Sequence, residues 1–264
     1  MGHTRLGALS RSKPWREVVS LIAVGADISQ IAEATIKAAE TAFSFVGDDA
    51  GYNHAVWLLT QLGLAGKSPN PLAHMREQGV NIPDETSVAG IVAALSEAID
   101  NAAYQHRGRR SDLGDLAHRA LVDAVVTRME SKVQQRSLFN MQADDTQRAL
   151  RSLGKEKEFG QLACDFYSRF TNECMNYFLS RTLATHLGDG QRFATTNQMS
   201  QFEKALATHC REASKIIEQF ASEWFSKHRY EENGEISRDS VQGFASYALN
   251  KMKDELRAGA QGDE

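Results

Sequence analysis

Apolar residues recur along this chain with the three-to-four-residue period of an α-helix. The segment from Val88 to Ile99 shows it most clearly, because its apolar residues Val88, Ile91, Val92, Leu95 and Ile99 would share one helical face. No stretch alternates apolar and polar residues with the period of two that a half-buried strand requires. We therefore predict helices throughout and no sheet.

Residues that favour the start or the end of a helix divide the periodic pattern into separate helices. Pro14 suits a first helical turn, Gly25 can end that helix, and Asp27 is a plausible N-cap for the next. Ser111 or Asp112 would begin another helix in the same way. The predicted helices cover approximately residues 14–25, 28–46, 88–104, 112–129, 143–153, 159–183, 199–225 and 241–256.

Proline usage supports long helices in the second half of the chain. All four prolines lie before residue 84. A glycine-led charged run, residues 154–158, separates two long helical patterns, and no repeat of fixed period is present. The sequence predicts an all-α fold, an irregular multi-helix bundle of two packed helical subdomains, residues 1–154 and 155–264.

Charge and hydropathy limit the classes of partner. The 264 residues include 30 Lys and Arg against 34 Asp and Glu, a net charge of −4, and the isoelectric point is near 6.1. This balance argues against a surface wholly devoted to nucleic-acid phosphates. The longest nearly apolar run, residues 18–26, is far shorter than the roughly 20 residues that span a bilayer. We expect a cytoplasmic protein without membrane contact.

The three cysteines, Cys164, Cys174 and Cys210, are odd in number and lie among apolar residues at helical spacing. Together with His209 they lack the short spacing of structural zinc sites. We interpret them as small core residues in a reducing compartment. The sequence gives no reason to predict a metal or another cofactor.

Motifs for common enzyme chemistry are incomplete in this chain. Gly66, Lys67 and Ser68 match the end of a phosphate-binding loop, but Gln61 stands where the loop requires its first glycine. The chain has neither a G-x-S-x-G nucleophile motif nor an H-E-x-x-H zinc motif. We therefore favour a protein without enzymatic activity and read residues 66–68 as a connection between helices.

One short match suggests an alternative. Arg181 is followed after four residues by His186, which resembles the R-x4–6-H motif of HEPN-family ribonucleases, and that family is all-helical. The resemblance implies metal-independent RNA cleavage across a dimer, with His186 acting on the 2′-hydroxyl or the leaving group and Arg181 stabilising the phosphate. Thr182 departs from the family, in which a polar Asn, Asp or His usually follows the arginine. The alternative interpretation is that Arg181 and His186 are ordinary cations near a helix C-terminus, where positive charge is favourable to the helix dipole.

Two basic clusters suggest a third function, an adaptor that contacts nucleic acid. Arg107, Arg109 and Arg110 lie beside His106 in a predicted exposed turn between two helices. A second cluster near the N-terminus consists of Arg5, Arg11, Lys13 and Arg16. Either cluster could touch phosphates, although terminal arms and loops are also commonly just solvated.

Our leading hypothesis is a non-enzymatic helical interaction or scaffold component of a larger bacterial assembly. Its aromatic stripes, residues 159–183 and 202–225, exceed what one helix pair can bury, so some of these side chains should meet the N-terminal half and the remainder another protein subunit or a second copy. The general all-helical character of the sequence is similar to that of helical accessory proteins encoded in bacterial defence cassettes, and this resemblance implies an antiviral accessory role.

Overall fold

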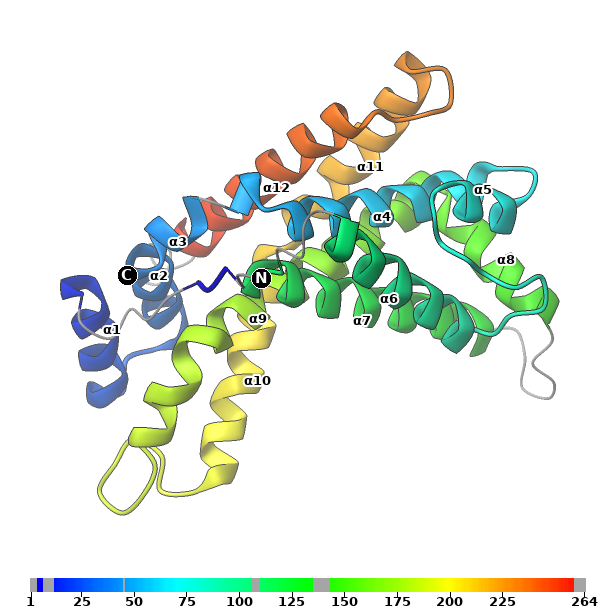
Figure 1. The fold of residues 1–264 in the computed structure, drawn as a ribbon. Helices are drawn as coiled ribbons and strands as arrows, with labels where there is room; N and C mark the ends of the chain where they lie inside the picture. The colour runs from blue at the N-terminus through cyan, green and yellow to red at the C-terminus, as the bar shows by residue number, and fades with distance from the viewer. Residues whose placement is uncertain (1–3, 7–11, 45, 106–109, 135–142, 259–264) are drawn as a thin grey trace.

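The computed structural model describes residues 4–6, 12–44, 46–105, 110–134 and 143–258. These ranges contain α-helices, one short 3-10 helix and two isolated bridges but no β-sheet, which confirms the all-α prediction. The helices in Figure 1 are α1 (Lys13–Val24), α2 (Ile28–Ala38), α3 (Glu40–Ser44), η1 (Val46–Asp48), α4 (Ala50–Lys67), α5 (Pro71–Glu77), α6 (Val88–Gln105), α7 (Asp112–Gln134), α8 (Ala143–Leu153), α9 (Glu156–Thr185), α10 (Thr196–Ala213), α11 (Lys215–Glu231) and α12 (Arg238–Ala258).

Local chemistry fixes the predicted helix starts. The Ser12 hydroxyl caps α1, whose first turn contains Pro14, as expected. Asp27 accepts a hydrogen bond from the backbone N–H of Gln30 at 2.9 Å and caps α2. Ser111 accepts one from a first-turn N–H of α7 in the same way. Each cap satisfies a donor that the first turn of a helix leaves without an intrahelical partner.

The C-terminal end of α1 is closed by residues from two parts of the chain. Gly25 adopts φ 80°, the left-handed conformation that glycine takes without strain. Arg192, which follows α9, donates hydrogen bonds to the carbonyl oxygens of Ile22 at 3.2 Å and Ala26 at 2.8 Å. Half-buried Arg192 therefore ties the loop between α9 and α10 to the end of α1.

The predicted helix over residues 28–46 is wrong, because α2 and α3 are separate. The backbone leaves the helix at Ala39, one turn after the Thr35 hydroxyl donates to the Ile31 carbonyl oxygen at 2.7 Å. Such back-bonding within a turn often bends a helix. Ala39 is itself buried, so the apolar period continues across the break and the sequence pattern does not reveal it.

The predicted helix over residues 199–225 is also divided, into α10 and α11. Ser214 lies at the junction, fully buried, and its hydroxyl donates to the Cys210 carbonyl oxygen at 2.6 Å. The buried hydroxyl is satisfied without a partner from another element. After the break, α11 packs mainly on α9 and makes little contact with α10.

The long helix α9 lies at the centre of the packing and contacts α7, α10 and α11 most extensively. Its aromatic side chains Phe159, Phe166, Tyr167, Phe170 and Phe178 are all buried. These side chains are covered by other helices of the same chain, as expected for part of the stripe. Tyr177 of the same stripe is 37% exposed, and the contact of the remainder with a second subunit stays a prediction.

One hydrophobic cluster extends through the described residues on both sides of the predicted boundary after residue 154. At one point the hydroxyl of buried Tyr52 in α4 donates to the Ala245 carbonyl oxygen in α12 at 2.8 Å, and it lies 3.3 Å from the Tyr167 hydroxyl in α9. The division into two subdomains stays a prediction, and the boundary itself is the turn between α8 and α9.

Glycines allow the closest helix crossings. A Cβ on Gly160 of α9 would overlap the Glu218 carbonyl oxygen and the Ser222 hydroxyl of α11. A Cβ on Gly66 in α4 would likewise overlap the backbone at Gly154. These contacts set how closely α11 and the α8–α9 turn approach their neighbours.

Two pairs of helices extend from the body in Figure 1. The α9–α10 pair runs toward the lower left, and the α11–α12 pair projects toward the upper right with its connecting loop at the far end. We call helices α11 and α12, residues 215–258, the α11–α12 arm. At the loop end of this arm Tyr230 is exposed, whereas Arg238 lies over the Trp57 ring of α4 at 4.3 Å.

Candidate functional site

Arg181 and His186, the predicted ribonuclease pair, lie near the end of α9 and at its C-cap, respectively. His186 Nδ1 lies 2.9 Å from the carbonyl oxygen of Thr182, so a proton on Nδ1 would bond the helix end. Five residues at about 100° each direct the two side chains about 140° apart around the helix. Within one chain this geometry does not aim them at a common point, and the ribonuclease hypothesis would need a second copy.

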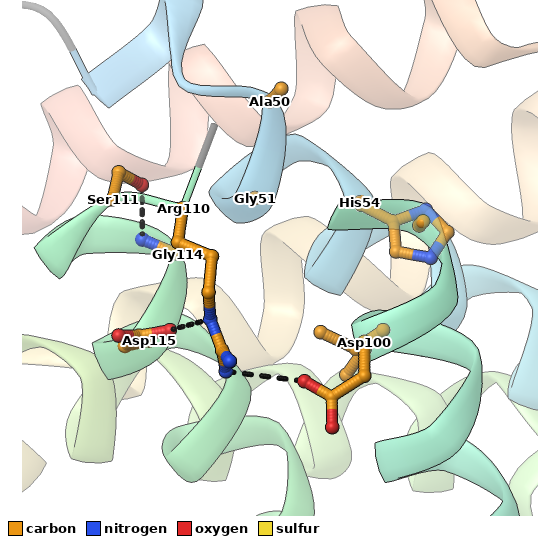
Figure 2. Close-up of a pocket in the computed structure, with 10 residues that line it drawn as sticks. Ala50, Gly51, His54, Asp100, Arg110, Ser111, Gly114 and Asp115 are labelled. Carbon is orange, nitrogen blue, oxygen red and sulfur yellow. Dashed lines mark hydrogen bonds and ion pairs between the residues drawn. The ribbon is translucent and has the colours of Figure 1, made fainter. Parts of the chain in front are cut away.

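The predicted nucleic-acid loop is described only in part. Arg107 and Arg109 lie outside the described residues. Arg110 is exposed, and Figure 2 shows its guanidinium between two carboxylates, 3.1 Å from an Asp100 oxygen and 3.5 Å from an Asp115 oxygen. Because two acidic groups offset its charge, Arg110 contributes less positive potential than the sequence suggests.

A small pocket lies beside Arg110, between α4, α6 and α7 (Figure 2). The N-terminal ends of α4 and α7 nearly touch here, since a Cβ on Gly51 would lie 2.6 Å from the Cα of Gly114. The cavity holds about 40 Å³, room for about two water molecules. This volume suits a helix crossing better than a substrate site. The remaining lining residues are Ala50, His54, Ile99, Asp100, Ala102, Ser111 and Asp115.

Burial favours the neutral form of the histidine near this pocket, His118. His118 Nε2 lies 3.2 Å from the Ser96 hydroxyl, which joins α7 to α6. Burial lowers the pKa of His118, although Asp100 and Asp115 act in the opposite direction. The imidazole is therefore neutral at neutral pH and serves as a hydrogen-bonding group between helices.

The three cysteines are free and buried. Burial raises the pKa of Cys164 to about 11 and that of Cys210 to about 12, and it raises the pKa of Cys174 well above the usual thiol range. Their thiols therefore stay protonated and unreactive at neutral pH. Within the described ranges, no group of three or more His, Cys, Asp or Glu side chains is placed to hold a metal ion.

The other sequence candidates lie at helix ends. Gly66 and Lys67 are the last residues of α4 and Ser68 is its C-cap, whereas a phosphate-binding loop connects a strand to a helix. In the N-terminal cluster, Arg5 is exposed and Arg11 lies outside the described residues. Lys13 and Arg16 belong to the first turns of α1. None of these described groups lines the pocket beside Arg110.

Sequence reasoning missed a cluster of charges between α7, α9 and α10. Asp165 of α9 is only 2% exposed and pairs with the Nε of Arg128 from α7. Arg211 of α10 lies 3.1 Å from the same carboxylate, and Arg169 lies 3.8 Å from it. We call these four residues the Asp165 cluster. They bring three cations to one buried anion.

The signal for this cluster was present in the sequence. Asp165, Ser168, Arg169 and Asn172 follow the spacing i, i+3, i+4, i+7, which places a polar stripe on an otherwise apolar helix. A polar stripe alone usually indicates a solvent-facing side. Arg128 and Arg211 are 37 and 46 residues away from Asp165, so only the fold assembles the cluster.

Stacked aromatic side chains lead from the core to the surface of the α11–α12 arm. The ring centroids of Trp224 and Phe244 are 4.2 Å apart, those of Phe244 and Phe220 are 5.6 Å apart, and those of Phe220 and Tyr247 are 4.6 Å apart. Tyr247 at the outer end is 49% exposed. Phe220, which is partly buried against the core, holds this exposed ring in a defined position.

The loop end of the arm is ordered by a carboxylate. Glu232 accepts hydrogen bonds from the Ser237 backbone N–H at 2.7 Å and from His228 Nδ1 at 3.2 Å. Burial alone would raise the pKa of Glu232, but hydrogen bonds from Ser240, Ser237 and His228 lower it to about 2. Asn233 and Gly234 then reverse the chain with φ of 57° and 98°, as their sequence predicts.

None of the helices described is long and apolar enough to cross a membrane. Comparisons of the chain with models of known protein families, with curated proteins and with solved structures find no match.

Proposed function

We propose that the protein is a non-enzymatic helical interaction component that contacts other protein subunits, or a second copy of itself, through the α11–α12 arm. The observation that carries this proposal is the concentration of exposed large apolar side chains on the arm. Tyr230 is 86% exposed near its loop end, and Ile216 and Tyr247 are exposed along it.

The chemistry of these side chains suits a protein partner. Tyrosine combines a large apolar ring with a hydroxyl that can bond at a partly wet surface, and it is frequent among the residues that dominate binding energy. The stacked rings beneath Tyr247 fix its orientation, so little side-chain entropy remains to be lost on binding. The exposed side chains therefore have features of binding groups.

The proposal also includes the setting expected from the sequence. The chain would act in the cytoplasm as one part of a larger bacterial assembly, with an accessory role in a defence cassette. The exposure of Tyr230, next to the loop that joins α11 and α12, supports a connecting role, because its ring is accessible to another molecule.

The test replaces exposed rings and leaves the rest of the arm intact. The double variant Tyr230→Ser and Tyr247→Ser removes two of them, and Val24→Ser is the control because Val24 is 76% exposed on α1, outside the arm. Sedimentation velocity over a concentration series compares each sample with the monomer mass of 29.2 kDa. A photo-crosslinking residue at position 230, with position 24 as the control, detects contact with a protein other than a second copy of this chain.

We expect wild type and Val24→Ser to form a larger species that the double variant does not form, or crosslinks from position 230 that position 24 does not give. The proposal fails if wild type is a strict monomer at every concentration and position 230 forms no crosslink beyond those from position 24.

A further inference from the structure

We infer that the groove between α9 and α10 binds a phosphate group of a nucleotide or polynucleotide, with Arg211 as the main ligand and Arg169 beside it. This site is separate from the α11–α12 arm and from the basic loop that contains Arg110. It goes beyond the proposed interaction function and does not depend on it.

The groove has the size and lining for such a group. Its volume of about 310 Å³ exceeds what a few waters need. Ser168, Arg169 and Asn172 line it from α9, and Ala207, Thr208 and Arg211 line it from α10. None of these described lining residues is acidic. The groove therefore combines two guanidinium groups with two hydroxyls and an amide.

The charges of the Asp165 cluster are unbalanced. Three arginines surround one carboxylate, so the cluster carries two positive charges in excess. One well-placed arginine, Arg128, already pairs with buried Asp165. Adding Arg211 and Arg169 at the groove side brings like charges close together, which opposes folding unless another anion offsets it. A bound phosphate dianion would supply the two missing negative charges.

The two arginines at the groove are held differently. Arg169 donates to the Asp165 backbone oxygen at 3.2 Å and to the Thr127 hydroxyl at 2.8 Å, so its guanidinium is fixed. Arg211 is 55% exposed and uses one N–H toward Asp165 at 3.1 Å, whereas a guanidinium has five N–H donors. Arg211 can therefore offer a forked pair of donors to an oxyanion while Asp165 orients it.

Asn172 extends the recognition beyond a bare oxyanion. Its amide lines the groove, and its Oδ1 is buried without a hydrogen-bond partner. Rotation of the amide toward the groove would let a ligand that carries a hydroxyl near its phosphate donate to this oxygen. Nucleotides have that combination, which is why we favour a nucleotide unit over inorganic phosphate. The same unit occurs free and within a nucleic-acid strand.

Binding is measured with fluorescence anisotropy on the full chain. The probes are a fluorescent ATP analogue and a short fluorescent single-stranded RNA, and inorganic phosphate is the competitor. Arg211→Gln is the test variant, because Arg128 still pairs with Asp165 and the fold should persist. Arg211→Lys keeps the positive charge but removes the forked pair of N–H donors. Arg257→Gln is the matched control, since it removes one exposed arginine that pairs with Glu40 at 3.2 Å on other helices.

We expect Arg211→Gln to weaken binding of the better probe by about tenfold, the loss of one charge-assisted contact. Arg211→Lys should bind with intermediate affinity, and Arg257→Gln should match wild type. If a strand is the ligand, Arg211→Gln should also reduce the slope of log K against log salt by about 0.7. If a free nucleotide is the ligand, the ATP analogue should bind at least as tightly as the RNA.

Three results would overturn the inference. Wild type could bind neither probe up to about 1 mM. Arg211→Gln could bind as tightly as wild type while its far-UV circular dichroism is unchanged. Arg257→Gln could weaken binding as much as Arg211→Gln does, which would indicate a diffuse charge effect and no site at the groove.

Discussion

Replacing Gly160 by alanine is the sharpest test of how the central helix packs. Gly160 lies inside α9, where an added Cβ would come well within 3.0 Å of the Glu218 carbonyl oxygen and the Ser222 hydroxyl. The serine can rotate away. The carbonyl belongs to the backbone of α11, so it can move only if the whole helix moves.

The expected change is the difference between two opposing effects. Overpacking a well-packed crossing costs about 1–3 kcal/mol, and backbone contact favours the upper end of that range. Alanine is a better helix former than glycine by about 1 kcal/mol. The net loss in the free energy of unfolding should be about 2 kcal/mol, or a fall in Tm of about 4–8 °C for a chain of this size.

Urea unfolding followed by circular dichroism measures this loss, and Gly243→Ala is the matched control. Gly243 lies inside α12, and a Cβ there would meet no atom within 4 Å. The same chemical change should therefore stabilise the control by about 0.5–1 kcal/mol. If Gly160→Ala were as stable as wild type with an unchanged m-value, the close crossing of α9 and α11 would be refuted.

Three other outcomes follow from described contacts. Glu232→Gln should destabilise the protein at pH 7 by at most about 1 kcal/mol, because the carboxylate is partly solvent-screened. The pKa of Glu232 is about 2 in the folded protein, below its ordinary 4.5. The difference in free energy of unfolding between the variant and wild type should therefore shrink as pH falls from 4.5 toward 2, and urea unfolding at each pH measures it. Arg192→Met should cost about 2 kcal/mol in urea unfolding, because two carbonyl oxygens at the end of α1 lose a charged donor. The three cysteines should react with iodoacetamide at pH 8 slowly in the native protein and quickly in urea, and rapid native labelling would contradict their burial.

The helix starts could be predicted because their causes are local. Asp27 and Ser111 each bond an N–H three residues later, within reach of a short sequence window. The breaks at Ala39 and Ser214 could not, because the apolar period continues through both. A buried serine in an apolar stripe is also compatible with an unbroken helix.

The candidate sites were harder to predict, because the effect of a charge depends on its neighbours in the fold. Arg110 reads as a cation of a basic loop, yet Asp100 and Asp115 face it. Arg211 reads as a solvent-facing cation at the end of α10, yet it shares Asp165 with Arg128. Such groupings join residues far apart in sequence, and no local pattern specifies them.

The hydrogen bond between Tyr52 and Ala245 has a consequence for how the chain is made. The two residues are 193 positions apart, and Ala245 lies in the last helix. A ribosome adding about 5–20 residues per second needs roughly ten seconds or more to extend the chain between them. Until α12 emerges, the nascent chain exposes the apolar surface around Tyr52. Packing around Tyr52 must therefore wait until α12 has been made, and during that interval the growing chain is most in need of a chaperone.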